Sequence, residues 1–346
     1  MKRSVLVISL LLLVACRLAT AQEAHIRAVY DEADAALAIM DSLNAGEPVT
    51  GGQWSALWES EGYTRLLERQ TSMGRVGGFG DKLAAWLQDP ENYKRAAILR
   101  DAVDGYRHFE ASSAGSRAGA YLPQGVVLEA SFYPVIKHTA NTFVFDLRGD
   151  PAIFVYVNPE NSPLFVESLL THELHHIGLA HCPEVVDYKN LSDDQRWVTS
   201  MLTMFGEGVA VLATAGGPNT HPHFYSTPNE WAIWERDVVN VASDLARVES
   251  FFKSVIDGTF PKEERRQALF RFIVTPEVPQ GPAYTLGWKM ASLVERRFGH
   301  SALLETMCDP RALLKLYNEA VKETLADGTP NLPAWSDEFI RALYAQ

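Results

Sequence analysis

The segment that decides the fold is SPLFVESLLTHELHHIGLAHCP, residues 162–183. Ser162 is a suitable N-cap, and Pro163 suits the first position of a helix. Apolar residues then follow at steps of three and four, as they do on the buried face of a helix: Phe165, Val166, Leu169, Leu170, Leu174 and Ile177. The pattern predicts a helix over most of this segment.

Two histidines on this predicted helix, His172 and His176, are four residues apart. Residues at that spacing project from one face of a helix, so both imidazoles can bind a single metal ion. Glu173 is rotated by about 100° from His172 and can reach a metal-bound water without binding the metal. The arrangement is the H-E-x-x-H motif of zinc hydrolases and predicts Zn²⁺ as the cofactor. An ordinary helix with several surface histidines is the alternative.

A catalytic zinc ion takes three protein ligands, so a third must come from elsewhere in the chain. His181 lies nine residues after His172, with Gly178 at six. The metzincin pattern places this histidine at ten and the glycine at seven, and the mismatch at both positions argues against His181. Two more histidines, His221 and His223, stand in a loop rich in glycine and proline and stay open as alternatives.

Glu207 is the preferred third ligand. It stands in Gly206-Glu207-Gly208-Val209-Ala210, within a stretch predicted to be helical from about residue 194 to residue 213. Apolar neighbours would bury its carboxylate, which is costly unless the charge is paired, and a metal ion is a good partner. The glycines on either side suggest that another backbone, such as that of the histidine helix, approaches closely. Helix capping or an ion pair with an arginine is the alternative role for Glu207.

The two segments together resemble the gluzincin metallopeptidases. The resemblance rests on His172-Glu173-x-x-His176 followed by Glu207-Gly208-x-Ala210, and it is greatest to bacterial families named for a zinc-dependent peptidase activity. Those families continue with a tyrosine, a glycine and a methionine on a late helix, and this chain has Tyr284, Gly287 and Met290. The resemblance spans roughly residues 152–299. It implies a mostly helical fold with a small sheet and a zinc ion held by His172, His176 and Glu207.

The resemblance also implies a function, the hydrolysis of peptide bonds in a peptide or protein substrate. Glu173 would be the general base, and the hydroxyl of Tyr284 could donate a hydrogen bond to the developing oxyanion. Packing in the core is the alternative role for Tyr284. In such enzymes the edge strand before the zinc helix binds the substrate backbone, and Ile153–Val157 is the matching segment.

Two rival functions stay open on the same residues. One is a catalytically silent, metal-stabilised binding or envelope-structure module on a peptidase-like scaffold. The other is a zinc hydrolase that acts on a non-peptide amide or ester, which the sequence cannot separate from a peptidase. Nucleic-acid binding is excluded as a function, because the net charge is −12 and no basic stripe is present.

The chain before the motif predicts helices and then short strands. The helices are expected at residues 26–43, ending near Gly46, at 54–67, and at 97–109. A stretch rich in Ser, Gly and Ala at residues 111–120 marks a candidate boundary. The strands are expected at 126–128, 143–147 and 152–157, the last two joined in a hairpin.

These elements predict an α+β fold that is mostly α-helical, in two parts. Residues 22–115 are expected to form a helical N-terminal region, and residues 120–346 a zincin-like catalytic domain with a small β-sheet. Cys182 follows the predicted histidine helix, and Cys308 is expected in a late helix. Whether the two cysteines pair stays open, because the sequence does not show how close they lie.

The N-terminus predicts export from a bacterial cell. Lys2 and Arg3 precede an apolar run, residues 5–15, that is too short to span a bilayer. Cleavage before Cys16 would leave a signal peptide of residues 1–15 and a lipid anchor on Cys16, whereas cleavage after Ala21 would give a signal peptide of residues 1–21. The mature chain, expected to contain no transmembrane helix, would be periplasmic or an outer-membrane lipoprotein.

Overall fold

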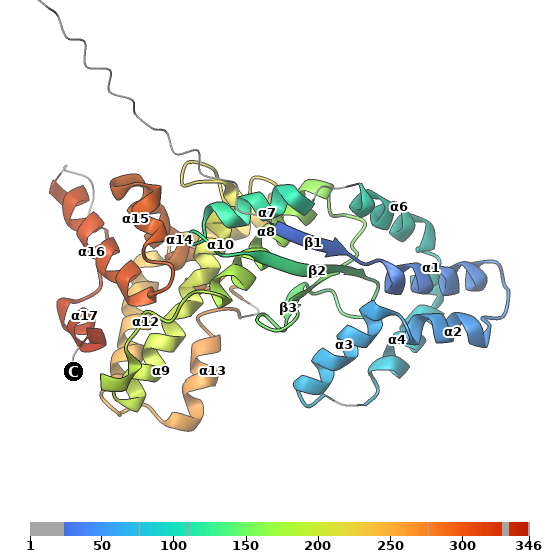
Figure 1. Cartoon of the computed structure of the whole chain (residues 1–346), viewed down its shortest axis with the longest axis horizontal. Coiled ribbons are helices and arrows are strands. Elements are labelled where there is room, and N and C mark those ends of the chain that lie inside the picture. The colour runs from blue at the N-terminus through green and yellow to red at the C-terminus, as the bar shows by residue number, and fades with distance from the viewer. Residues whose placement is uncertain (1–23, 76, 109–110, 276, 327–331, 345–346) are drawn as a thin grey trace, which may run out of the picture.

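A computed structural model describes residues 24–75, 77–108, 111–275, 277–326 and 332–344 (Figure 1). The predicted signal peptide and both predicted cleavage sites lie outside the described residues. Within them, the fold is α+β and mostly helical, as predicted.

A four-stranded mixed sheet lies near the middle of the molecule (Figure 1). Its strands are β1 (Ala24–Ala28), β2 (Leu128–Val135), β3 (Phe143–Phe145) and β4 (Ala152–Tyr156), in the order β1-β2-β4-β3. β1 and β4 run parallel to β2, whereas β3 pairs antiparallel with β4. The hairpin predicted from residues 143–157 is confirmed. The strand predicted at 126–128 begins instead at Leu128 and is longer.

The prediction that Ile153–Val157 is an edge strand is wrong. β4 lies between β2 and β3, so both of its sides carry hydrogen bonds along residues 152–154. The edge of the sheet on this side is β3, because the hairpin folds back on the outside of β4.

The first predicted helix, residues 26–43, is a strand followed by a helix. β1 covers residues 24–28 and pairs with β2, about a hundred residues later in the chain. The helix α1 begins only at Asp31 and runs to Asn44, and the chain then turns at Gly46, whose φ is +71°. The apolar spacing of Ile26 and Val29 fits a helix by coincidence, because pairing with a distant strand decides their conformation.

Helices α2 to α7 complete the N-terminal part. The region predicted as one helix at 54–67 is two, because the Ser60 side chain caps a new helix. The Ser-, Gly- and Ala-rich stretch forms α7, where a Cβ on Gly115 would lie only 2.4 Å from that of Ala24, so small residues let α7 pack against β1. The division at residues 115–120 stays a prediction. The helices are α2 (Gly51–Trp58), α3 (Glu61–Ser72), α4 (Phe79–Gln88), α5 (Pro90–Tyr93), α6 (Ala96–Arg107) and α7 (Ala111–Ala120).

The C-terminal part is helical, and the helix predicted over 194–213 runs from Asp193 to Ala215 with a 3₁₀ turn at Leu202–Phe205. By length and composition this run could cross a membrane, but most of it is buried inside the protein. The helices are α8 (Pro163–Ala180), α9 (Asp193–Met201), α10 (Gly206–Ala215), α11 (Pro228–Val238), α12 (Val241–Ile256), α13 (Arg265–Phe270), α14 (Pro282–Phe298), α15 (His300–Leu304), α16 (Pro310–Ala326) and α17 (Asp337–Tyr344), with further 3₁₀ turns at Tyr188–Asn190 and Lys262–Glu264.

Two hydrophobic cores adjoin where α8 packs against α10. The apolar face of α8, including Leu170 and Leu174, belongs to a core with α1, α6 and the sheet. The apolar face of α10, including Val209 and Leu212, belongs to a second core with α12, α14 and α16. Because α8 also packs against α10, the histidines of one helix face the glutamate of the other across this junction.

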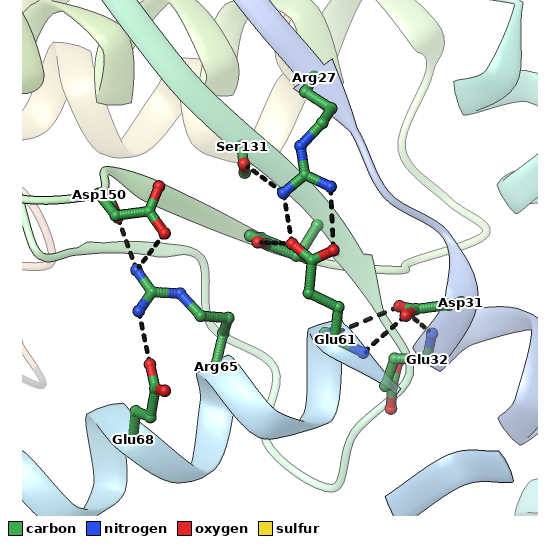
Figure 2. Close-up of polar contacts among 10 residues, drawn as sticks. Arg27, Asp31, Glu32, Glu61, Arg65, Glu68, Ser131 and Asp150 are labelled. Carbon is green, nitrogen blue, oxygen red and sulfur yellow. Dashed lines mark hydrogen bonds and ion pairs between the residues drawn. The ribbon is translucent and has the colours of Figure 1, made fainter. Parts of the chain in front are cut away.

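A polar network fastens α3 to the sheet (Figure 2). The guanidinium of Arg27 on β1 donates to both carboxylate oxygens of Glu61, and Tyr133 on β2 donates to Glu61 as well. Bonds from Arg27 and Tyr133 lower the pKa of Glu61 to about 2. The backbone N–H groups of Glu61 and Gly62 donate to Asp31 at 2.6 and 3.1 Å, which ties the start of α3 to the start of α1.

Candidate metal centre

The helix that carries the two histidines begins as the sequence predicts. Ser162 caps α8 by accepting a hydrogen bond from the Phe165 N–H at 3.1 Å, and Pro163 is the first helical residue. His172 and His176 project from one side of α8. His175, between them, is fully buried on another side, where its Nε2 donates to the Tyr121 carbonyl.

Three side chains meet at one point between α8 and α10. The Nε2 atoms of His172 and His176 lie 3.0 Å apart, and each lies 3.1 Å from Oε2 of Glu207. Two ligands of a tetrahedral Zn²⁺ at 2.0–2.1 Å would lie about 3.3 Å apart. This nearly equilateral triangle of two imidazole nitrogens and one carboxylate oxygen therefore fits a zinc ion in both size and donor chemistry.

The charges of the three groups favour one another. Burial on its own would raise the pKa of Glu207, but the adjacent His176 and His172 hold it well below its ordinary value. Burial on its own would lower the pKa of His176, but Glu207 raises it to about 9. The carboxylate is thus ionised in a largely buried position, whereas His176 must give up its proton to bind a metal ion.

Glu173 and Tyr284 lie beside this triangle without being part of it. Burial raises the pKa of Glu173, opposed by His172 and His176. Tyr284 comes from α14, and its ring lies nearly parallel to that of His172, with 6.1 Å between the ring centroids. Burial, the charge of Glu207 and a hydrogen bond with Glu207 raise the pKa of Tyr284, so its hydroxyl keeps its proton and can donate a hydrogen bond.

A single cavity of about 1150 Å³ contains all five of these side chains; we call it the metal cleft. It is larger than a typical small-ligand pocket. Residues of β3 and the hairpin turn line it, and so does the segment from Thr306 to Leu313.

Cys182 and Cys308 pair, which answers a question that the sequence left open. Their Cα atoms lie 5.4 Å apart, and the disulfide joins the end of α8 to the loop before α16. Cys308 lies in this loop and not, as predicted, in a helix. Both cysteines line the metal cleft, so the bond fixes two of its walls together.

The other histidines with candidate roles are not brought into the triangle. His181 ends α8, lines the metal cleft, and donates from Nδ1 to the Ile177 carbonyl at 2.9 Å. His221 stacks on Trp231 and lies 2.9 Å from Glu235. His223 bonds to Gln280 and Ser226. Among the described residues, only His172, His176 and Glu207 form a cluster that could hold a metal ion.

Gly208, which follows Glu207, packs against α14 and not, as expected, against the histidine helix α8. A Cβ on Gly208 would lie 2.0 Å from the backbone N of Trp288 on α14, and a Cβ on Gly287 would lie 2.6 Å from the Phe205 carbonyl oxygen. The helix that approaches α10 most closely at Gly208 is therefore α14, whereas α8 meets Gly206 only through the Leu179 side chain. This contact also places Tyr284, one turn before Gly287, next to Glu207.

Sequence reasoning missed most of the residues that shape the metal cleft. Phe143, Arg148 and Met307 line it, but none of them belongs to a motif. The only available indication was the position of Phe143 in the predicted hairpin just before the histidine helix.

Two histidines from one turn of a helix and a carboxylate from a second helix form a group that could hold a single metal ion. A family model with the description "Putative zinc dependent peptidase (DUF5700)" matches residues 54–325. The chain belongs to this family, as the resemblance predicted. Searches among curated proteins and among solved structures gave no match.

Proposed function

We propose that the protein is a peptidase of the gluzincin type, in which His172, His176 and Glu207 hold one Zn²⁺ ion. The observation that carries the proposal is the triangle of Nε2, Nε2 and Oε2 atoms, with sides of 3.0–3.1 Å. The family, named for zinc-dependent peptidase activity, supports the reaction type.

Each of the other groups has a chemical task in this proposal. The zinc ion would supply a Lewis acid and lower the pKa of a water molecule. Glu173 would act as the general base that takes a proton from the attacking water and passes it to the leaving amine. The hydroxyl of Tyr284 would donate a hydrogen bond to the carbonyl oxygen as negative charge develops on it. A peptide would lie along β3, the edge strand that lines the metal cleft.

Zinc dependence is the direct test of this proposal. We expect the purified protein to contain about one zinc ion per chain and to cleave members of a mixed peptide library. A chelator should abolish cleavage and stoichiometric Zn²⁺ should restore it, because the ion completes the site. Metal analysis and mass spectrometry of the peptides give both readouts. Bound zinc with no cleavage of any peptide would instead favour the silent binding module.

We also propose that the mature protein works outside the cytoplasm. The Cys182–Cys308 disulfide supports this, because disulfides persist in oxidising compartments. Expression with the native leader should yield a shortened chain. Its intact mass should correspond to an N-terminal, lipid-modified Cys16 in the membrane fraction or to a Gln22 N-terminus in the soluble fraction. An uncleaved chain in the cytoplasm would contradict the proposal.

A further inference from the structure

We propose that a second pocket, adjacent to the metal cleft, binds an acidic group of the substrate. The pocket, which we call the basic pocket, has a volume of about 520 Å³ and is lined by residues of α3, α4 and the chain from Lys137 to Phe143. The inference rests on the proposed function, because it assigns a substrate class to the same enzyme.

The basic pocket concentrates positive charge in an acidic protein. Its lining includes Arg69, Arg75, Lys82 and Lys137, and no aspartate or glutamate is among the residues that line it. The whole chain carries 43 acidic residues against 31 basic ones, so four cations around one cavity with no acid is a local reversal of the average. A cavity walled by one sign of charge attracts ligands of the other sign.

Three cations of the basic pocket form no ion pair within the described part of the chain. They are Arg69, which is half-buried, Arg75 and Lys82. Burial and the nearby Arg75 lower the pKa of Arg69. A carboxylate or phosphate bound between these side chains would relieve their repulsion, and guanidinium groups bind such anions through paired hydrogen bonds.

One carboxylate does act on the pocket, but from behind its wall. Glu32 favours the charged form of Lys137 and is completely buried, accepting a hydrogen bond from the Ile136 N–H at 2.9 Å. Burial raises the pKa of Glu32 to about 8, which favours its neutral form. Glu32 is not among the residues that line the pocket.

The wall of the basic pocket is held in place by Lys137. Its ammonium group donates to the side-chain and backbone oxygens of Asn141, at 2.6 and 2.9 Å, and to oxygens of Thr139. These bonds occupy Lys137 and fix the loop up to β3. The groups left to bind a ligand are thus Arg69, Arg75 and Lys82.

Phe143 connects the basic pocket with the metal cleft. Its side chain lines both cavities, and the guanidinium of Arg69 lies 3.5 Å above the centre of its ring. Asn141 lines the basic pocket and Thr142 lines the cleft, so the two cavities are adjacent along the chain as well. A peptide that lies in the metal cleft along β3 can therefore extend past Phe143 and place an acidic side chain, or its terminal carboxylate, beside Arg69.

Binding of matched peptides tests this assignment without turnover. Pairs of peptides that differ only in Glu or Gln, placed at successive positions, are titrated calorimetrically into the zinc-loaded Glu173→Gln variant. At one position we expect the Glu peptide to bind about 10-fold more tightly, as one charge-assisted hydrogen bond would give. The preference should weaken with added salt.

The matching variants locate the preference. Arg69→Gln with Arg75→Gln should abolish it, whereas Arg69→Lys should keep most of it because the charge remains. A control that removes two charges elsewhere, Lys94→Gln with Arg266→Gln, should leave the preference unchanged, since both residues are exposed and line neither cavity. Thermal melting of each variant verifies that it is folded.

Inorganic phosphate, titrated alone, separates a substrate group from a free anion. Phosphate binding that depends on Arg69 and Arg75, with no preference for Glu over Gln at any position, would overturn the assignment to the substrate. Equal or undetectable binding of both peptides, together with no phosphate binding, would show that the basic pocket does not bind anions. A wild-type protein that cleaves no peptide would contradict the proposed function, but the binding comparison would still decide the pocket.

Discussion

Replacing Glu173 with Gln should lower kcat for peptide hydrolysis by about 10²- to 10⁴-fold, the usual contribution of a general base. The amide has nearly the same size but cannot accept the proton. The metal-binding triangle should be intact in the variant, because Glu173 is not one of its three corners. The zinc content should therefore equal that of the wild-type protein.

Metal analysis and steady-state kinetics on the same preparations check this expectation. Glu160→Gln, the same chemical change at an exposed position outside the metal cleft, is the control and should keep wild-type kcat. A Glu173→Gln variant with full zinc and full activity would show that the proposed mechanism is wrong. A variant that loses its zinc would instead assign Glu173 a role in metal binding.

The histidine helix could be predicted in detail because local interactions determine it. The cap at Ser162, the proline at the first helical position and the apolar spacing all lie within the same segment. The α+β class and the hairpin before the helix were predicted for the same reason. The meeting of His172 and His176 with Glu207 was inferred from chemistry and resemblance, and the structure brings the three together.

Features that depend on distant contacts could not be predicted in this way. Ile26 has the apolar spacing of a helix, but pairing with β2 makes its segment a strand. The edge strand is β3 and not, as predicted, β4, because sheet order is decided by the whole fold. The contact between Gly208 and Gly287 likewise joins residues far apart in sequence, so a glycine could be recognised as a close approach but its partner could not be named.

Replacing Glu207 with Ala should reduce zinc affinity more than about 100-fold, which exceeds the loss that follows when only an outer partner of a ligand is removed. Two imidazoles would remain, and two neutral ligands hold Zn²⁺ far less tightly than a set that includes a carboxylate. Competition with a chromophoric chelator measures the affinity of the wild type and the variant under the same conditions.

The competing histidines are the controls for this experiment, and they make it decisive. His181→Ala removes a hydrogen bond to the Ile177 carbonyl, and His221→Ala removes a contact with Trp231 and Glu235, so both variants should bind zinc as the wild type does. If His181→Ala or His221→Ala lost the zinc while Glu207→Ala kept it, the third ligand would be a histidine and the gluzincin assignment would fall. Because Glu207 is the residue that, within the described part of the chain, completes a triangle with sides of 3.0–3.1 Å, we expect the loss in Glu207→Ala only.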